Sequence, residues 1–152
     1  MKKVLCVSFV FFLSIFGTGC FSSSSSDSAT KYTISFDFAP ATGSSSTVSI
    51  SSTNIFTHTS GEYDAEYDAT ATSYVSFYFL DPSSIPATLT KNTTGFGFDY
   101  IDANGTDWTL GSETLSMTVT QLTPTIKGTF SGTVINGTTT ATITNGTFEG
   151  SL

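Results

Sequence analysis

The sequence predicts an all-β fold, an antiparallel meander that closes into a small barrel or a two-sheet sandwich. From residue 31 onward the chain is dominated by Thr, Ser, Gly, Val, Ile, Phe and Tyr. Apolar residues there alternate with Ser or Thr in short runs, and no helical three-four spacing persists. We therefore expect one all-β domain over residues 31–152, with almost no helix and with enough apolar mass for a single core.

The first expected strand covers residues 32–38. Its even-numbered residues are apolar and share one face, while Thr33, Ser35 and Asp37 share the other. Pro40 and Gly43 follow, and both residue types favour a turn. The strand is therefore expected to bury one face and to end near Pro40.

The second expected strand runs from residue 47 to about residue 59. Val48 and Ile50 lie in one phase of the alternation, whereas Ile55 lies in the other. A bulge near residues 51–54 is expected to reconcile the two phases.

Residues 62–79 keep a single phase, with aromatic, Ala and Val side chains at odd positions. A strand over this whole segment would exceed the usual length of about 3–10 residues. We therefore expect a break near residues 69–73, followed by an irregular crossing over residues 81–86.

Turn chemistry predicts how five strands pair between about residues 95 and 148. Residues 136–137 suit a two-residue hairpin loop, and residues 103–105 suit a three-residue loop with Gly in the left-handed position. Loops at residues 111–112 and 122–125 connect the remaining strands. The predicted pairs are Phe130–Ile143, Gly132–Ala141, Phe98–Leu110, Tyr100–Trp108, Trp108–Leu115 and Met117–Phe130. All of them place the large apolar side chains on one face of the meander and Ser or Thr on the other.

Residues 1–19 have the composition of a cleaved signal peptide. Lys2 and Lys3 precede an apolar run over residues 4–16, and small residues occupy positions 17–19. The apolar run is shorter than the roughly 20 residues that a membrane-spanning helix needs. We therefore expect an exported protein without a helical anchor.

The sequence Gly17-Thr18-Gly19-Cys20 resembles the bacterial lipoprotein signal, in which small residues precede a cysteine that is acylated. It departs from that signal at Gly17, where Leu is usual, and the same small residues also suit ordinary secretory cleavage. The resemblance implies that Cys20 carries lipid such as palmitate and attaches the protein to a membrane. In proteins with this signal an Asp after the cysteine favours the inner membrane, and Phe21-Ser22 lacks it. The resemblance therefore implies the outer membrane of the cell envelope.

Residues 20–30 are rich in Ser and are expected to form a flexible tether. Cleavage after residue 19 leaves Lys31, Lys91 and Lys127 as the only basic residues against all twelve acidic ones, a formal net charge of −9. Nucleic acids and anionic membrane surfaces are recognised by rows of Lys and Arg. The composition therefore excludes both as partners of the mature domain. With Cys20 as its sole cysteine, the mature chain is also expected to lack disulfides.

Four carboxylates form the candidate metal site. Glu62, Asp64, Glu66 and Asp68 project from one face of a predicted strand. Calcium binds several carboxylate oxygens, so calcium is the candidate cofactor. The alternative is a charged edge strand that prevents edge-to-edge aggregation.

Four aromatic residues, Tyr74, Tyr78, Tyr100 and Trp108, are the candidate ligand-binding residues. Aromatic faces stack on sugars or line apolar pockets, so the expected ligand is a small apolar or carbohydrate molecule. The alternative is that they form the core. We interpret Asp102 and Asn104, beside Gly105, as turn-forming residues.

No catalytic signature accompanies the single histidine, His58. We therefore expect a non-enzymatic, lipid-anchored envelope or surface protein with a binding or structural role. The alternatives are an enzyme that acts on envelope glycans through paired carboxylates and a calcium-stabilised surface module. The segments Ile126-Lys127-Gly128-Thr129-Phe130-Ser131-Gly132-Thr133 and Ile143-Thr144-Asn145-Gly146-Thr147-Phe148 resemble the final hairpin of small bacterial lipoproteins that have no assigned activity.

Overall fold

The computed structural model describes residues 32–53, 55–70, 73–93, 95–111 and 114–152. These residues form β-strands and connecting turns, and none of them lies in a helix. No helix long and apolar enough to cross a bilayer is therefore found in this part of the chain. The strands are β1 (Tyr32–Pro40), β2 (Ser46–Ser52), β3 (Phe56–Thr59), β4 (Glu62–Thr70), β5 (Ser73–Leu80), β6 (Ala87–Thr90), β7 (Phe96–Ile101), β8 (Asp107–Thr109), β9 (Ser116–Gln121), β10 (Thr125–Asn136) and β11 (Thr139–Ser151).

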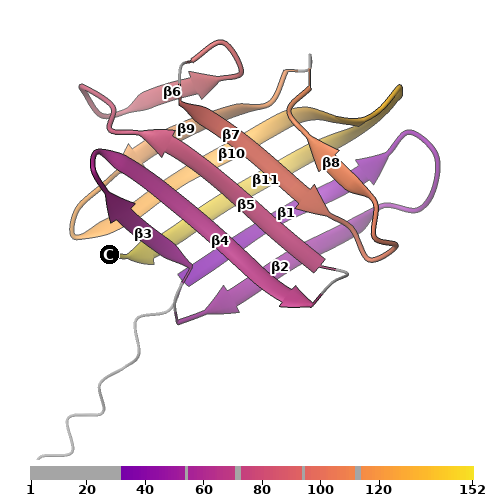
Figure 1. The fold of residues 1–152 in the computed structure, drawn as a ribbon, viewed down its shortest axis with the longest axis horizontal. Helices are drawn as coiled ribbons and strands as arrows, with labels where there is room; N and C mark the ends of the chain where they lie inside the picture. The colour runs from indigo at the N-terminus through magenta and orange to yellow at the C-terminus, as the bar shows by residue number, and fades with distance from the viewer. Residues whose placement is uncertain (1–31, 54, 71–72, 94, 112–113) are drawn as a thin grey trace, which may run out of the picture.

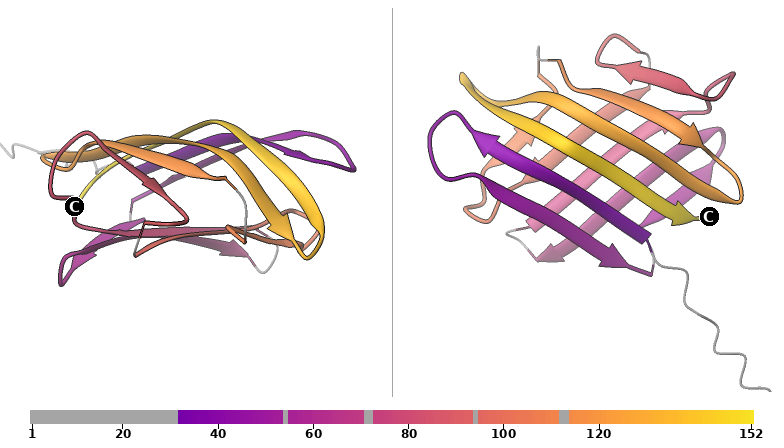
Figure 2. Two further views of the ribbon diagram at one scale, coloured as in Figure 1. Left: turned by 90° about the horizontal axis from the view of Figure 1, so that it is seen from above. Right: turned by 180° about the vertical axis from the view of Figure 1, so that it is seen from behind.

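All eleven strands belong to one antiparallel sheet that curls into a half-barrel (Figure 1). The main path runs β2-β1-β11-β10-β8-β7-β5-β4-β3, while β9 pairs with β10 and β6 pairs with β9. Figure 2 shows two layers, with β1, β2, β10 and β11 in one and β3, β4, β5 and β7 in the other. The all-β prediction is confirmed, and the sheet is a half-barrel whose two layers face each other.

The core lies between the two layers and consists largely of aromatic rings. Phe36 of β1 contacts Phe98, Tyr100 and Phe130, with ring centroids 6.3, 5.2 and 5.5 Å away. Phe148 of β11 lies 5.0 Å from the Phe77 ring of the opposite layer. Burial of these rings from both layers supplies the main favourable free energy of folding.

The first strand forms as predicted. The four apolar residues of its predicted inner face are at most 8% exposed, and the strand ends at Pro40. The predicted bulge near residues 51–54 is wrong. The chain instead leaves β2, which pairs with β1, and enters β3, which pairs with β4 at the far end of the sheet. Ile55 and Phe56 are both 3% exposed, because consecutive apolar residues are buried where the chain passes between layers.

The break in the segment 62–79 is confirmed, because β4 and β5 form an antiparallel hairpin around it. Residues 71–72 lie outside the described part of the chain.

The segment after residue 86 contains β6, a strand that was not predicted from the sequence. It has four residues, of which only Leu89 is buried. So short a run shows no alternation that sequence reasoning can detect.

Two predicted pairings are confirmed. Met117 pairs with Phe130 across the turn at residues 122–125, and Tyr100 pairs with Trp108 across the turn at residues 103–105. Gly105 has a φ of 78°, the left-handed conformation that this turn requires. The predicted Phe98–Leu110 pair is absent from the β7–β8 ladder, because β8 ends at Thr109.

The predicted Phe130–Ile143 and Gly132–Ala141 pairs are wrong. Ile143 pairs with Gly132, Phe130 pairs with Gly146, and Ala141 pairs with Val134. The hairpin loop begins one residue later than expected, since Asn136 already pairs with Thr139. Between the loop and Gly132 this change moves the register by two residues, and side chains alternate with a period of two, so the side chains there stay on their predicted faces. Phe130 and Ile143 are accordingly both buried.

A bulge then interrupts the β10–β11 ladder between Phe130 and Gly132. The pairing there leaves Thr144 and Asn145 opposite the single residue Ser131, and Asn145 has a φ of 54°. Asn tolerates this left-handed conformation better than most residues. The extra residue keeps the apolar residues of β11 on the core side on both sides of the bulge.

The predicted Trp108–Leu115 pair is also wrong, because β8 and β9 do not pair with each other. Both pair with the long strand β10, β9 along residues 127–131 and β8 at Ile135. The backbone before β9 passes close to Gly132, where a Cβ atom would lie 2.4 Å from the Thr114 carbonyl oxygen. This close approach and a φ of 140° require glycine at position 132.

Candidate binding pocket

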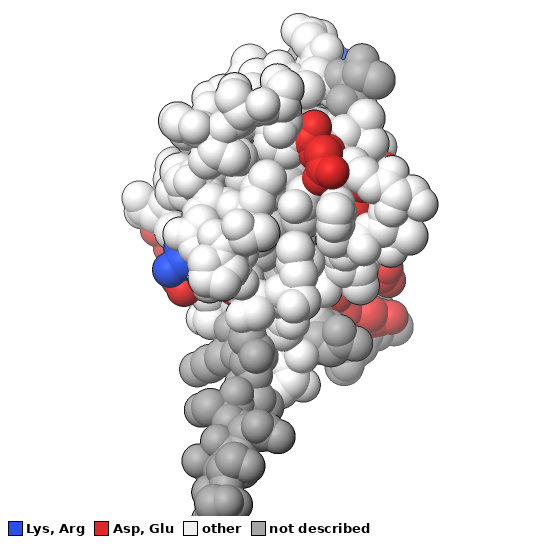
Figure 3. Space-filling model, turned by 90° about the vertical axis from the view of Figure 1, so that its left-hand side faces the viewer, with Lys and Arg blue, Asp and Glu red and all other residues white. Residues whose placement is uncertain are grey.

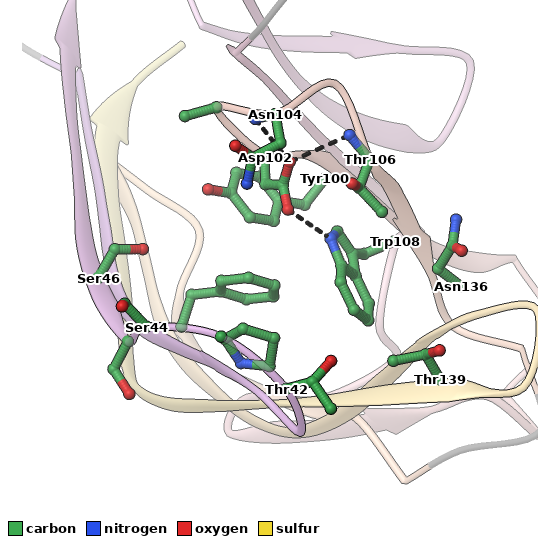
Figure 4. A pocket seen from close by; sticks show the side chains of 15 residues that line it. Thr42, Ser44, Ser46, Tyr100, Asp102, Asn104, Thr106, Trp108, Asn136 and Thr139 are labelled. Carbon is green, nitrogen blue, oxygen red and sulfur yellow. Dashed lines mark hydrogen bonds between the residues drawn. The ribbon is translucent and has the colours of Figure 1, made fainter.

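A pocket of about 420 Å³ lies where three turns meet at one end of the half-barrel (Figure 4). The loop after β1, the turn between β7 and β8, and the hairpin between β10 and β11 contribute its walls. Its lining consists of Phe38, Pro40, Thr42, Gly43, Ser44, Ser45, Ser46, Tyr100, Asp102, Ala103, Asn104, Thr106, Trp108, Asn136 and Thr139. Its volume falls within the range of about 300–1,000 Å³ that small-molecule sites occupy.

Three aromatic side chains form the floor of the pocket. Phe38 contacts Tyr100 and Trp108 edge to face, with ring centroids 5.0 and 5.3 Å away. All three are at most 5% exposed, so the core on the far side holds their rings in place. Tyr100 and Trp108 are direct partners across β7 and β8. The floor is therefore largely apolar, and a small part of each ring is exposed in it.

Asp102 organises the turn that forms one wall (Figure 4). Its Oδ1 atom accepts hydrogen bonds from the backbone N–H groups of Asn104 (2.8 Å) and Thr106 (3.0 Å). Its Oδ2 atom accepts one from Trp108 Nε1 (3.1 Å). The sequence-based interpretation of Asp102 as a turn former is confirmed, and the same carboxylate also orients the indole ring of the floor.

Burial alone would raise the pKa of Asp102, which is only 8% exposed. The hydrogen bonds from Thr106, Trp108 and Asn104 outweigh that effect and hold the pKa of Asp102 below its usual value. Burial, and to a lesser extent the charge of Asp102, raise the pKa of Tyr100. At neutral pH the pocket therefore contains one carboxylate and a neutral phenol.

The rim of the pocket carries hydroxyl and amide groups. Residues 42–46 are exposed, and the Ala41 backbone N–H donates to the Thr140 carbonyl oxygen (2.9 Å), which ties the loop after β1 to β11. Asn136 Nδ2 donates to the Asp107 carbonyl oxygen (2.8 Å) and so joins the β10–β11 hairpin to β8. Apart from Asp102, every lining residue is uncharged.

The structure separates the four aromatic residues proposed from the sequence. Tyr100 and Trp108 lie in the pocket. Tyr78 lies on the outer face of β5, where it is 40% exposed and packs over Gly97 of β7. Tyr74 is on the same face of β5, opposite Ile101. Only two of the four residues can therefore contact one ligand in the pocket.

The four carboxylates lie on the outer face of β4. Asp64, Glu66 and Asp68 border a shallow depression of about 280 Å³ with Ile55 and Thr57. Within the described ranges, no group of three or more His, Cys, Asp or Glu side chains is arranged to hold a metal ion. Figure 3 shows one side of the molecule, where acidic side chains gather in patches separated by uncharged surface. Calcium binding stays a prediction from the sequence.

His58 takes part in a contact that sequence reasoning missed. Its Nε2 atom lies 3.1 Å from Asp81 Oδ1, and its ring stacks on Tyr63 with centroids 4.2 Å apart. The Asp81 backbone N–H donates to the Gly61 carbonyl oxygen (2.8 Å) at the adjoining turn. These contacts fasten the β3–β4 hairpin to the end of β5.

Sequence reasoning also missed the rim of the pocket. Its residues come from three turns, near Gly43, Gly105 and Gly137, that are distant in sequence. Each turn has a local signal, but the order of the strands decides which turns share an end of the sheet.

No protein-family model, curated protein or solved structure matches this chain.

Proposed function

We propose that this protein is a non-enzymatic binding module of the cell envelope, and that its pocket binds a neutral carbohydrate. The observation that carries the proposal is the combination of an aromatic floor with an uncharged hydroxyl and amide rim. Sugars present apolar C–H faces and hydroxyl edges, which match aromatic rings and polar rim groups respectively.

The charges of the pocket support a neutral ligand. The lining contains no Lys or Arg, so it offers no cationic side chain to an anionic ligand. It also contains a single carboxylate, Asp102, whose oxygens already accept three hydrogen bonds. Glycoside hydrolysis usually needs two carboxyl groups that flank the scissile bond. This composition favours binding over the alternative of a glycan-cleaving enzyme.

The binding proposal is tested by titrating the protein with neutral mono- and disaccharides while following the fluorescence of Trp108, the only tryptophan in the chain. At least one sugar is expected to change the emission saturably. Tyr100→Phe keeps the ring but removes one hydrogen-bonding group, which is worth about 0.5–1.5 kcal/mol, so we expect about 2- to 10-fold weaker binding.

Tyr78→Phe is the matched control for this titration. It makes the same chemical change on the outer face of β5, outside the pocket, and is expected to leave the affinity unchanged. A flat titration with every sugar, or an equal loss of affinity in both variants, contradicts the binding proposal.

The proposed location rests on the N-terminal segment, which lies outside the described residues. We infer that Cys20 is acylated and anchors the domain to the outer membrane through the Ser-rich tether over residues 20–30. A lipid anchor would hold the pocket at the membrane surface without requiring a spanning segment.

Labelling cells with radioactive palmitate tests the anchor. The wild-type chain is expected to incorporate label and Cys20→Ala to lose it. Cys6→Ala is the matched control and is expected to keep the label, because Cys6 lies within the segment removed on export. An unlabelled wild type, or equal labelling of the Cys20→Ala chain, rules the anchor out.

A further inference from the structure

The described sheet has three edge strands, β2, β3 and β6. An edge strand exposes unpaired backbone N–H and C=O groups that another strand can pair with, so proteins shorten, charge or interrupt their edges. β3 has four residues, and β4 carries Glu66 and Asp68 just beyond it. β6 also has four residues and lies between Pro86 and Lys91. Two of the three edges therefore carry recognised protection.

The edge formed by β2 has none of these features. Its seven residues include no charged residue and no Pro. Its register with β1 is unbroken from Tyr32–Ser52 to Phe38–Ser46, so no bulge turns the edge away. Thr47 Oγ1 donates to Asp37 Oδ1 of β1 (2.7 Å), which also holds the strand to its neighbour. The edge is regular, neutral and suited to accept another strand.

The two faces of β2 indicate which strand would fit. On the core side Ile50 is 5% exposed, whereas Val48, nearer the end of the sheet, is only half-buried. On the outer side Thr47, Ser49 and Ser51 are exposed. An added strand must therefore place apolar side chains inward at alternate positions and small polar ones outward.

We propose that residues 47–51 of β2 pair in antiparallel orientation with the same residues of a second copy of this chain, about a two-fold axis at Ser49. In this register Val48 of each copy faces Ile50 of the other on the core side, and Thr47 faces Ser51 on the outer side. The same patch then serves both copies, as two-fold symmetry requires. The layer that contains β2, β1 and β11 continues across the junction into the second copy.

Among the surfaces through which two copies of this chain could meet, charge favours the β2 edge over the outer face of β4. The chain has a formal net charge of −7, and four of its acidic residues lie on the outer face of β4. Two copies that meet through that face would place like charges together, which is unfavourable. The neutral β2 edge brings no charge of its own to the junction.

Cysteine cross-linking in cells that produce the full-length chain tests the register. Residues directly opposite each other in an antiparallel pair have Cβ atoms about 4.5–5.5 Å apart. Ser49→Cys is therefore expected to give a covalent dimer with a short thiol-specific cross-linker. Thr47→Cys chains are expected to cross-link to Ser51→Cys chains but not to one another. Thr142 is exposed on β11, which has a neighbouring strand on each side. Thr142→Cys is therefore the matched control. It measures the cross-linking that occurs without β2 pairing in a chain that also contains Cys6 and Cys20.

A second measurement uses the oligomeric state of the full-length chain in detergent. Ser49→Lys would place two like charges opposite each other, so dimer affinity is expected to fall about tenfold or more, whereas Thr142→Lys leaves it unchanged. Unaltered Trp108 fluorescence shows that each variant is folded. The proposal is overturned if the chain sediments as a monomer, or if Ser49→Cys cross-links no more than Thr142→Cys.

Discussion

Phe36→Ala is expected to lower the free energy of unfolding by about 3–5 kcal/mol, the usual cost of removing a buried phenylalanine. Phe36 is 1% exposed and contacts Phe98 and Tyr100 of β7 as well as Phe130 of β10. Its removal leaves a cavity between strands that are far apart along the sheet. Because domains of this size are stable by only about 5–15 kcal/mol, this one change removes a large share of the total.

Urea unfolding followed by Trp108 fluorescence measures this effect. Tyr78→Ala is the matched control, because it truncates an aromatic residue of similar size that is 40% exposed on the outer face. We expect that control to cost no more than about 1 kcal/mol. Equal costs for the two variants would mean that the aromatic cluster does not hold the two layers together.

Alternation and turn chemistry predicted the local parts of this fold. The turn at residues 103–105 paired Tyr100 with Trp108, and the turn at residues 122–125 paired Met117 with Phe130, as the structure confirms. The Tyr100–Trp108 pair depends only on residues within or beside its loop. The Met117–Phe130 pair also depends on a bulge between Lys127 and Gly128, which shifts the β9–β10 register by one residue and was not predicted. Near its loop the β10–β11 hairpin was predicted with a register error of two residues, which alternation cannot detect because it leaves those side chains on their faces. The bulge between Phe130 and Gly132 was not predicted.

The order of the strands could not be predicted, because it depends on contacts between distant segments. Consecutive strands usually pair, yet β8 and β9 both pair with β10, which is long enough to accommodate them at different positions. Likewise, β2 and β3 follow each other in sequence but lie at opposite ends of the sheet path. These arrangements bury the inner faces of both layers against each other. No single segment of the sequence shows which strands must be neighbours for that to happen.

The pocket was predictable only in part for the same reason. Tyr100 and Trp108 were proposed from their aromatic character, and Asp102 was interpreted correctly as a turn former. The rim residues Asn136 and Thr139 join them only because β10 and β8 are neighbours. Local chemistry therefore identified the floor of the pocket, and strand order supplied its rim.

Asp102→Asn is expected to destabilise the protein by about 2–3 kcal/mol, because the wild-type carboxylate accepts bonds through both oxygens. An asparagine side chain has one acceptor oxygen. Whichever way its amide is oriented, its NH₂ group faces either Trp108 Nε1–H or the two backbone N–H groups of Asn104 and Thr106. The buried donors on that side lose their partner, so the turn and the pocket wall are expected to loosen together.

Asp107→Asn is the matched control for this loss. It removes one negative charge from the same turn region, but the Asp107 side chain is exposed, and Asn136 bonds its backbone carbonyl oxygen, which the substitution keeps. We expect it to cost less than about 0.5 kcal/mol in urea unfolding at pH 7. If the two variants lose equal stability, the effect comes from net charge and not from the hydrogen bonds of Asp102.

The dependence on pH separates the carboxylate from the shape of its side chain. The pKa of Asp102 in the folded protein lies below the value of about 3.9 expected in an unfolded chain. Its ionised form therefore contributes its full stabilisation above about pH 4, and this contribution is lost as the pH falls through the folded pKa. The stability difference between wild type and Asp102→Asn should be largest at neutral pH and should shrink at acid pH. A difference that stays constant with pH would show that ionisation of Asp102 does not stabilise the turn that orients Trp108.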